Sequence, residues 1–189
     1  SRGLAPPEWD ITRKYITIYG IARGMKYLHK EACIHRDLKP ANILLTDRLF
    51  PQIADFGLAK WYNIEDSSDL SICGTPLYAA PEILSGKSTY DESIDVYSFG
   101  LIMYEVLTGR RPYDQFSKTP SLLPAKIIEG FRPEFPNIIN ITQTLKDLIQ
   151  QCWNAERRDR PSFASIVETL KNTSIISALG VNVEEFENY

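Results

Sequence analysis

An apolar helical segment in the middle of the chain constrains the fold more than any other feature. From about Glu92 to Thr108 the residues follow a helical pattern, and apolar side chains occur nearly all the way round the helix. Such a helix must be covered on every side, because an exposed face would place apolar side chains in water. Its most apolar run is broken by a serine, a glycine and a glutamate, and it is too short to span a bilayer. The segment therefore predicts a domain built around one central, buried helix.

Further helices are predicted on both sides of this segment. Asp10 can cap a helix that runs to about Glu31, with apolar side chains at helical spacing along one face. Gly109 is suited to end the central helix, because glycine readily adopts the left-handed conformation. With 189 residues, of which 43% are hydrophobic and 24% charged, the chain is long enough for one core. The other predicted helices span about 122–129, 142–153 and 162–170.

A small β-hairpin is predicted in the first third of the chain. Two short apolar runs, at residues 43–45 and 52–54, flank a polar turn at residues 46–48. After the hairpin, residues 58–80 are polar and rich in serine, without any period, which predicts a long loop. A loop of that length in a compact domain is usually functional or disordered. The fold class is therefore mainly α, with one hairpin.

The composition argues against several classes of function. The formal net charge of -3 gives no bulk attraction to nucleic acid or to an anionic membrane. Cys33, Cys73 and Cys152 are far apart in the sequence, and only two histidines are present, so a zinc site is not expected. We interpret the cysteines as reduced thiols and, like His29, as packing residues. We therefore expect a cytoplasmic, intracellular protein, with no membrane span in this chain and no nucleic-acid partner.

The residues best suited to chemistry lie around the predicted hairpin. Asp37 can accept a hydroxyl proton and orient a nucleophile, and Lys39 can neutralise a transferring phosphoryl group. The side-chain oxygen of Asn42 is a hard ligand of the kind that Mg²⁺ prefers. Asp55 follows the second strand, and an antiparallel hairpin brings its two ends together. We therefore expect Asn42 and Asp55 to meet at one metal ion, beside the carboxylate of Asp37.

Five motifs in this order resemble those of eukaryotic protein kinases. Residues 35–42 read H-R-D-L-K-P-A-N, residues 55–57 read D-F-G and residues 80–82 read A-P-E, which match the kinase signature. Residues 95–100, D-V-Y-S-F-G, open the central helix, and residues 160–163 read R-P-S-F. The resemblance covers essentially the whole chain. A lone D-F-G would be weak, whereas five motifs in family order are highly specific.

The resemblance implies a part of the kinase fold and not the whole. The chain has no G-x-G-x-x-G loop and no V-A-I-K strand, which belong to the N-terminal β lobe of the family. The implied architecture is the C-terminal lobe: a helical core with a small hairpin that carries the catalytic and metal-binding loops. We expect residues 1–175 to form this lobe and residues 176–189 to be a C-terminal tail. The absent N-terminal lobe is an expected partner.

The resemblance also implies a role for each residue of the reactive cluster. Asp37 resembles the catalytic base, and Lys39 resembles the contact to the γ-phosphate of ATP. Thr75 resembles the threonine that bridges these two residues. Asn42 and Asp55 resemble the Mg²⁺ ligands, so ATP and Mg²⁺ are the implied cofactors.

Supporting residues around the cluster follow from the same resemblance. Leu44 resembles the residue under the adenine ring, and His35 resembles the histidine that packs against the D-F-G phenylalanine, Phe56, which Gly57 follows. Arg36 resembles the arginine that receives a phosphate from the long loop, and Asp95 resembles the carboxylate that hydrogen-bonds the catalytic-loop backbone. Glu82 and Arg160 resemble the acid–arginine pair that anchors the long loop. The candidates for phosphorylation are Ser67, Ser68 and Ser71.

Several of these residues also have plain structural interpretations. His35 can be a packed core histidine that transfers no proton. Asp55 alone can be a turn former before a glycine, although its pairing with Asn42 favours a metal. The three loop serines can be solvated side chains that carry no phosphate. The acid–arginine pair is structural in either case.

The motif variants indicate the substrate class. Residues 39–41, Lys-Pro-Ala, and residues 74–76, Gly-Thr-Pro, resemble the serine/threonine form, whereas residues 96–100 and 152–153 resemble the tyrosine-kinase-like branch. Residues 156–157, Glu-Arg, depart from the Asp-Pro of that branch, which puts the local turn in doubt. The implied function is transfer of the ATP γ-phosphate to serine or threonine of protein substrates, in signalling. This chain alone is expected to be inactive; the alternative is a catalytically inactive lobe that binds other proteins.

Overall fold

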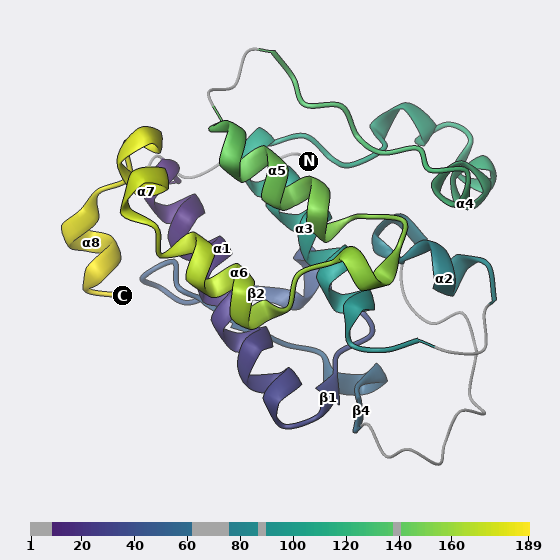
Figure 1. The fold of residues 1–189 in the computed structure, drawn as a ribbon, viewed down its shortest axis with the longest axis horizontal. Helices are drawn as coiled ribbons and strands as arrows, with labels where there is room; N and C mark the ends of the chain where they lie inside the picture. The colour runs from purple at the N-terminus through teal and green to yellow at the C-terminus, as the bar shows by residue number, and fades with distance from the viewer. Residues whose placement is uncertain (1–8, 62–75, 87–89, 138–140) are drawn as a thin grey trace.

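A computed structural model describes residues 9–61, 76–86, 90–137 and 141–189 of the chain (Figure 1). The predictions for Ser67, Ser68, Ser71, Cys73 and Thr75 lie outside these residues. Within the described ranges the molecule is mostly helical, with two short antiparallel sheets of two strands each. No helix in these ranges is both long and apolar enough to cross a membrane.

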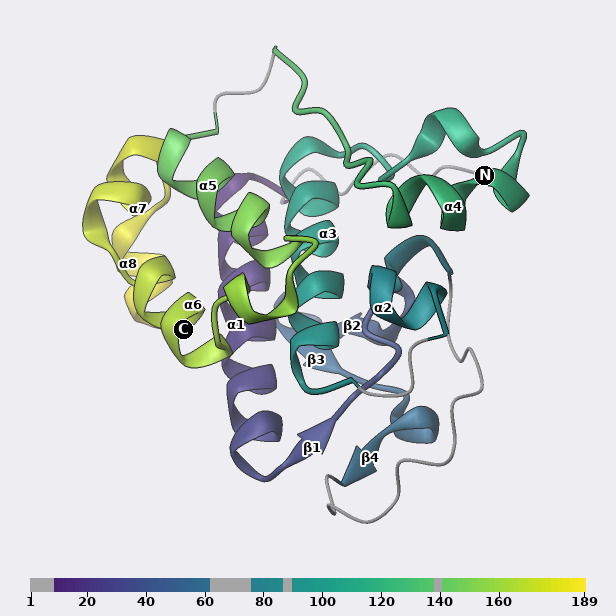
Figure 2. The same cartoon turned by 45° about the vertical axis from the view of Figure 1, so that its right-hand side comes forward.

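The predicted central helix is α3, Ser93–Thr108, which lies in the middle of the molecule (Figure 2). Nearly all of its residues are buried, because α1 and α5 pack against it and close its apolar faces. At Gly100 a Cβ atom would lie 2.9 Å from the Cβ of Cys152 in α5, so only glycine allows these two helices to cross this closely. The helix ends at Gly109, whose φ of 66° is the left-handed conformation expected there.

The other long helices are confirmed to within about two residues at each end, the usual uncertainty of helix boundaries. Asp10 caps the first helix by accepting a hydrogen bond from the backbone N–H of Arg13 at 2.8 Å, and Thr142 and Ser162 cap two later ones. The first helix packs against both the central helix and the one capped by Ser162. These helices are α1 (Ile11–Lys30), α4 (Leu123–Ile128), α5 (Gln143–Cys152) and α6 (Phe163–Leu170).

The predicted hairpin is also confirmed, with its second strand shifted by one residue. Strand β2, Ile43–Leu45, pairs antiparallel with β3, Pro51–Ile53, so that Leu44 lies opposite Gln52. A second pair was not predicted: β1, Cys33–Ile34, pairs with β4, Lys60–Trp61. The prediction of an uninterrupted loop over 58–80 was therefore wrong at its beginning, because a strand of two residues shows no alternation in sequence.

Several short elements complete the described chain. Helix α2, Pro81–Leu84, is a single turn that begins with proline at a position suited to it. Helices α7 (Thr173–Leu179) and α8 (Val183–Glu187) follow α6, and α8 packs against α1, so part of the expected tail is helical. The 3₁₀ turns are Pro40–Asn42, Phe56–Leu58, Pro76–Tyr78, Asp114–Phe116, Pro120–Leu122 and Arg157–Asp159.

Two of the three cysteines are packing residues, as expected. Cys33 and Cys152 are free and buried. Burial raises the pKa of both thiols, and the nearby carboxylate of Asp95 adds to the effect at Cys33. Both therefore stay protonated and unreactive at neutral pH.

Candidate active site

In the loop between β1 and β2, two of the predicted residues, Lys39 and Asn42, contact the carboxylate of a third, Asp37. Lys39 Nζ lies 2.6 Å from Asp37 Oδ2. Asn42 Nδ2 donates to the backbone oxygen of Asp37 at 2.8 Å and to Asp37 Oδ2 at 3.1 Å. Asp37 and Asn42 are both buried, with 9% and 5% of their surface exposed. The carboxylate is therefore fixed in one orientation, with a cation beside it.

Asp95, in the first turn of α3, fixes the backbone of this loop from below. Its Oδ2 accepts from the backbone N–H of His35 at 2.9 Å, and its Oδ1 accepts from that of Arg36 at 2.9 Å. Arg36 has a φ of 69°, which an L-residue adopts only at a cost in free energy of about 1–3 kcal/mol. The two hydrogen bonds to a carboxylate that is only 1% exposed offset this cost. Asp95 thus holds the loop in a conformation that it would not adopt alone.

His29 also contacts this carboxylate, a role that the sequence analysis missed. Its Nε2 lies 2.9 Å from Asp95 Oδ2, which already receives the hydrogen bond from His35. We expected His29 to be a packing residue, and its ring does lie edge-on to Phe163 at 5.0 Å. The hydrogen bond joins residues 66 positions apart, so no local sequence pattern could indicate it.

His35 connects the loop between β1 and β2 to the far strand of the hairpin. Its Nδ1 accepts from the backbone N–H of Asp37 at 3.3 Å, and its Nε2 lies 3.0 Å from the backbone oxygen of Ala54. Because Nδ1 accepts and Nε2 must donate, we assign the neutral tautomer that carries its proton on Nε2. Its ring also lies 5.3 Å from that of Phe56. The residue acts in the structure as a linker, with no free nitrogen for proton transfer.

The two ends of the hairpin meet, as expected. The backbone N–H of Ala54 donates to the backbone oxygen of Asn42 at 2.9 Å, which places Asp55 next to the Asn42 strand end. Asp55 is exposed and has a φ of 62°, and its Oδ1 accepts from the N–H of Gly57 at 3.4 Å. The left-handed conformation of Asp55 turns the chain at the first residue of the D-F-G segment.

The donor set suits a hard cation that completes its coordination with other oxygens. Among the described residues no group of three histidine, cysteine or acidic side chains could hold a metal alone. Asn42 and Asp55 instead supply one amide oxygen and one carboxylate from adjoining positions. Mg²⁺ is usually held in this way, by one or two protein carboxylates with phosphate oxygens and water. The residues present therefore fit a hard divalent cation such as Mg²⁺.

Two apolar side chains beside these ligands are open to solvent. Leu44 is 54% exposed and Phe56 is 47% exposed. Leu44 lies two residues after Asn42, and Phe56 follows Asp55 directly. Each candidate metal ligand therefore has an exposed apolar residue close to it in the chain.

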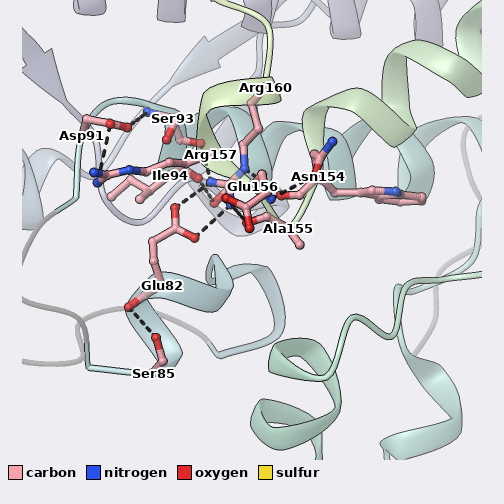
Figure 3. Close-up of polar contacts among 12 residues, drawn as sticks. Glu82, Ser85, Asp91, Ser93, Ile94, Asn154, Ala155, Glu156, Arg157 and Arg160 are labelled. Carbon is pink, nitrogen blue, oxygen red and sulfur yellow. Dashed lines mark hydrogen bonds and ion pairs between the residues drawn. The ribbon is translucent and has the colours of Figure 1, made fainter.

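Glu82 and Arg160 form a buried ion pair, shown in Figure 3. Two parallel hydrogen bonds, of 2.6 and 2.9 Å, join the guanidinium to the carboxylate, and the Arg160 side chain is fully buried. Arg160 also donates to the backbone oxygens of Asn154 at 2.9 Å and Ser93 at 3.1 Å. One side chain thus fastens α2, the start of α3 and the loop after α5 together.

The turn that departs from the family pattern is regular. Arg157 begins the 3₁₀ turn Arg157–Asp159, beside the buried ion pair. Arg157 Nη1 lies 3.7 Å from Asp91 Oδ2, and both side chains are partly exposed (Figure 3). The Glu156–Arg157 sequence therefore changes the residues of the turn while the turn itself forms.

A second polar contact to α3 was not predicted. The hydroxyl of Tyr78 donates to Glu105 Oε2 at 2.5 Å, and Ser98 Oγ donates to the backbone oxygen of Tyr78 at 2.9 Å. Burial raises the pKa of the Glu105 carboxyl, although the hydrogen bond from Tyr78 partly opposes this. Burial also raises the pKa of the Tyr78 phenol, so it remains a donor at neutral pH. The glutamate that interrupts the apolar run of α3 was the available signal for this contact.

Comparisons with known proteins identify the family of the chain. The protein kinase domain family matches residues 8–170, so the chain belongs to this family. Members of the family use ATP and a divalent metal and act on proteins.

Several curated relatives carry kinase names. The RGS domain-containing serine/threonine-protein kinase A of Dictyostelium discoideum is 38% identical over 165 residues, which are 86% of this chain and 14% of that protein. The Acanthamoeba polyphaga mimivirus protein R831, whose name describes a serine/threonine-protein kinase/receptor, is 39% identical over 171 residues, which are 88% of this chain and 10% of that protein. The chain spans only a small fraction of the length of these relatives.

Proposed function

We propose that this chain is the C-terminal, catalytic lobe of a serine/threonine protein kinase of the tyrosine-kinase-like branch. The observation that carries the proposal is the carboxylate of Asp37, held between Lys39 at 2.6 Å and Asn42 at 3.1 Å. Asp55 stands at the adjoining end of the same hairpin. A base, a cation and two hard oxygen ligands are the groups that phosphoryl transfer requires at one place.

Each residue has a distinct task in the proposed reaction. Asp37 accepts the proton of a serine or threonine hydroxyl and orients its oxygen toward the γ-phosphorus of ATP. Lys39 binds an oxygen of the transferred group, and the proposed role of Thr75, which lies outside the described residues, is to bridge Lys39 and Asp37. Asn42 and Asp55 would hold Mg²⁺, which would supply positive charge beside the phosphates. Because Asp95 fixes the loop beforehand, little reorganisation is needed when substrate arrives.

The exposure of Leu44 and Phe56 supports an N-terminal lobe as the covering partner. Leu44, proposed as the floor under adenine, and Phe56 would both lose exposed surface under such a lobe. Without that lobe, Lys39 and a bound cation would attract the phosphates in water. There the attraction of a charge pair about 4 Å apart is worth only about 1 kcal/mol. We therefore propose that the chain alone folds but binds ATP weakly and transfers no phosphate, and that it acts in signalling inside the cell.

A groove bordered by the 3₁₀ turn at 76–78 suits a protein substrate. It has a volume of about 240 Å³ and is lined mostly by apolar side chains, among them Leu77, Phe116 and Leu123. We propose that an extended segment of the protein substrate docks in this groove.

The metal role of Asp55 is tested by two titrations. The protein needed carries an N-terminal kinase lobe ahead of this chain, and we call it the two-lobe protein. Asp55→Ala should weaken binding of the Mg²⁺–nucleotide complex by at least about tenfold, the effect seen even for groups that only support metal ligands. Binding of the metal-free nucleotide should change little, because the lost group is a hard oxygen ligand. Calorimetry with and without Mg²⁺ measures both.

Asp47→Ala is the matched control for this test. Asp47 is an exposed carboxylate in the turn of the same hairpin, away from the candidate ligands. This variant should bind both forms of the nucleotide as the wild type does. An equal loss of affinity with and without Mg²⁺ in Asp55→Ala would remove Asp55 from the metal site.

A further inference from the structure

The C-terminal segment Val181–Tyr189 lies beyond the family match, which ends at residue 170, and returns to the first helix. Its start is fixed by the backbone N–H of Asn182, which donates to Thr12 Oγ1 at 3.0 Å. Further along, the ring of Phe186 lies 5.5 Å from that of Tyr15 and 4.9 Å from that of Tyr19. The segment is therefore seated on α1 by a hydrogen bond and an aromatic cluster.

Tyr189 joins this segment to the hairpin. Its ring lies 6.3 Å from that of Tyr19 on α1 and 4.8 Å from that of Phe50, which immediately precedes β3. Figure 1 shows the end of α8 beside the turn of the hairpin. Because Tyr189 contacts both elements at once, it ties the position of the hairpin to that of the helix.

Two glycines of α1 make room for the hairpin, and one of them also for Tyr189. A Cβ atom at Gly20 would lie 2.5 Å from Pro51 Cγ and would overlap the hydroxyl of Tyr189. One turn later, a Cβ atom at Gly24 would lie 2.7 Å from Ile53 Cδ1. Glycine inside a helix costs about 0.8–1.0 kcal/mol relative to alanine. Two glycines lie on the same face of the helix, and β3 packs there close to the helix backbone.

Strand β2 of the hairpin is only partly covered on either face, since neighbouring side chains of a strand point to opposite faces. Leu44 is 54% exposed and Leu45 is 41% exposed. A hairpin of two strands is at best marginally stable alone. Its position is therefore set by α1 and by Tyr189 at one end, and by the loop of Asn42 at the other.

We propose that Tyr189 is a positioning residue for the metal-binding hairpin. Its ring, seated over Gly20, holds the turn end of the hairpin, and the three-residue strands transmit that position to Asn42 and Asp55. The metal part of this inference rests on the proposed kinase function. The mechanical part, that Tyr189 restrains the hairpin, does not.

Amide hydrogen exchange of the chain tests the mechanical part. The informative amides are those of Thr46, bonded to the Phe50 oxygen at 2.9 Å, and Ala54, bonded to the Asn42 oxygen at 2.9 Å. Tyr189→Ala should speed exchange at both by at least about threefold, since aromatic contacts of this kind stabilise measurably. The amides of α3 should exchange as in the wild type. An equal increase in exchange at all amides, or no change in exchange at the hairpin amides, would overturn the proposal.

Three further variants make the test specific. Tyr189→Phe keeps the ring and should restore slow exchange. Tyr27→Ala removes an α1 tyrosine that is 63% exposed and should leave the hairpin unchanged. Gly20→Ala should reproduce the effect of Tyr189→Ala, although alanine favours the helix, because its methyl group displaces the tyrosine. Normal hairpin exchange in Gly20→Ala would contradict the seating of Tyr189 over this glycine.

Metal affinity of the two-lobe protein tests the positioning role. Tyr189→Ala should raise the Mg²⁺ concentration for half-maximal nucleotide binding by at least about threefold, with Tyr189→Phe unchanged and metal-free binding unaltered. Faster hairpin exchange with unchanged Mg²⁺ dependence would reduce Tyr189 to a structural contact and overturn the proposal. If instead the wild type shows no Mg²⁺-dependent nucleotide binding at all, the proposed function fails, and hydrogen exchange still decides whether Tyr189 restrains the hairpin.

Discussion

Replacing Asp37 by asparagine should lower the kcat of the two-lobe protein by about 10²–10⁴-fold, the usual contribution of a general base. Nucleotide affinity should change little, because the proposed contacts of ATP are to Lys39, Asn42 and Asp55. Asparagine has the same shape as aspartate, so its one oxygen can still accept from Lys39 or Asn42, as Asp37 Oδ2 does at 2.6 and 3.1 Å. It cannot accept the substrate proton. Steady-state kinetics and nucleotide titration together separate the two effects.

Asp47→Asn is the control for this experiment. It makes the same chemical change at an exposed carboxylate in the hairpin turn and should leave kcat unaltered. An Asp37→Asn protein that keeps full kcat would show that Asp37 is not the base. A variant that loses nucleotide affinity as strongly as kcat would indicate that the loop itself has collapsed.

Removal of Glu82 should have the largest effect on stability. Glu82→Ala leaves the guanidinium of Arg160, which is fully buried, without its carboxylate partner. Breaking a buried pair in this way costs about 3–5 kcal/mol. Urea unfolding of the chain should show the loss as a lower midpoint. The same variant should loosen α2, because Arg160 links that helix to the start of α3 and to the loop after α5.

Two comparisons make the stability test specific. Glu168→Ala removes a carboxylate that lies 3.7 Å from Lys171 on an exposed surface, and should cost no more than about 1 kcal/mol. The double change Glu82→Ala with Arg160→Ala should cost less than the sum of the two single changes, because no charge is then left buried alone. A loss below about 1 kcal/mol in Glu82→Ala would contradict the assigned role of the pair.

The long helices could be predicted because their signals are local. The helix after Asp10 and the one after Thr142 each begin with a capping side chain, and apolar residues repeat at helical spacing behind it. The strands β1 and β4 lack such signals, because each has two residues and exists only through its partner. Helices α7 and α8 were not predicted for a similar reason. They are short, and their formation depends on packing against the rest of the chain.

The contacts of the candidate site also fall into those between residues close in sequence and those between distant residues. Asp37, Lys39 and Asn42 lie within six positions of one another, so a loop must bring them together. The pair of Glu82 and Arg160, 78 positions apart, was expected only through the resemblance to kinases. Contacts without a motif were missed, among them the hydrogen bond of His29 to Asp95 and the packing of Tyr189 on the hairpin. A single sequence holds no local record of such distant contacts.

Phosphoamino-acid analysis of the two-lobe protein tests the central claim most directly. The protein is incubated with γ-labelled ATP, Mg²⁺ and a general acceptor protein, and the labelled residues of the acceptor are identified. Label on serine and threonine is the predicted result, lost when the metal is chelated and lost in Asp37→Asn. Label confined to tyrosine would contradict the substrate class. No transfer by the wild type, or equal transfer by Asp37→Asn, would contradict the proposal that this lobe carries the catalytic site of a serine/threonine kinase.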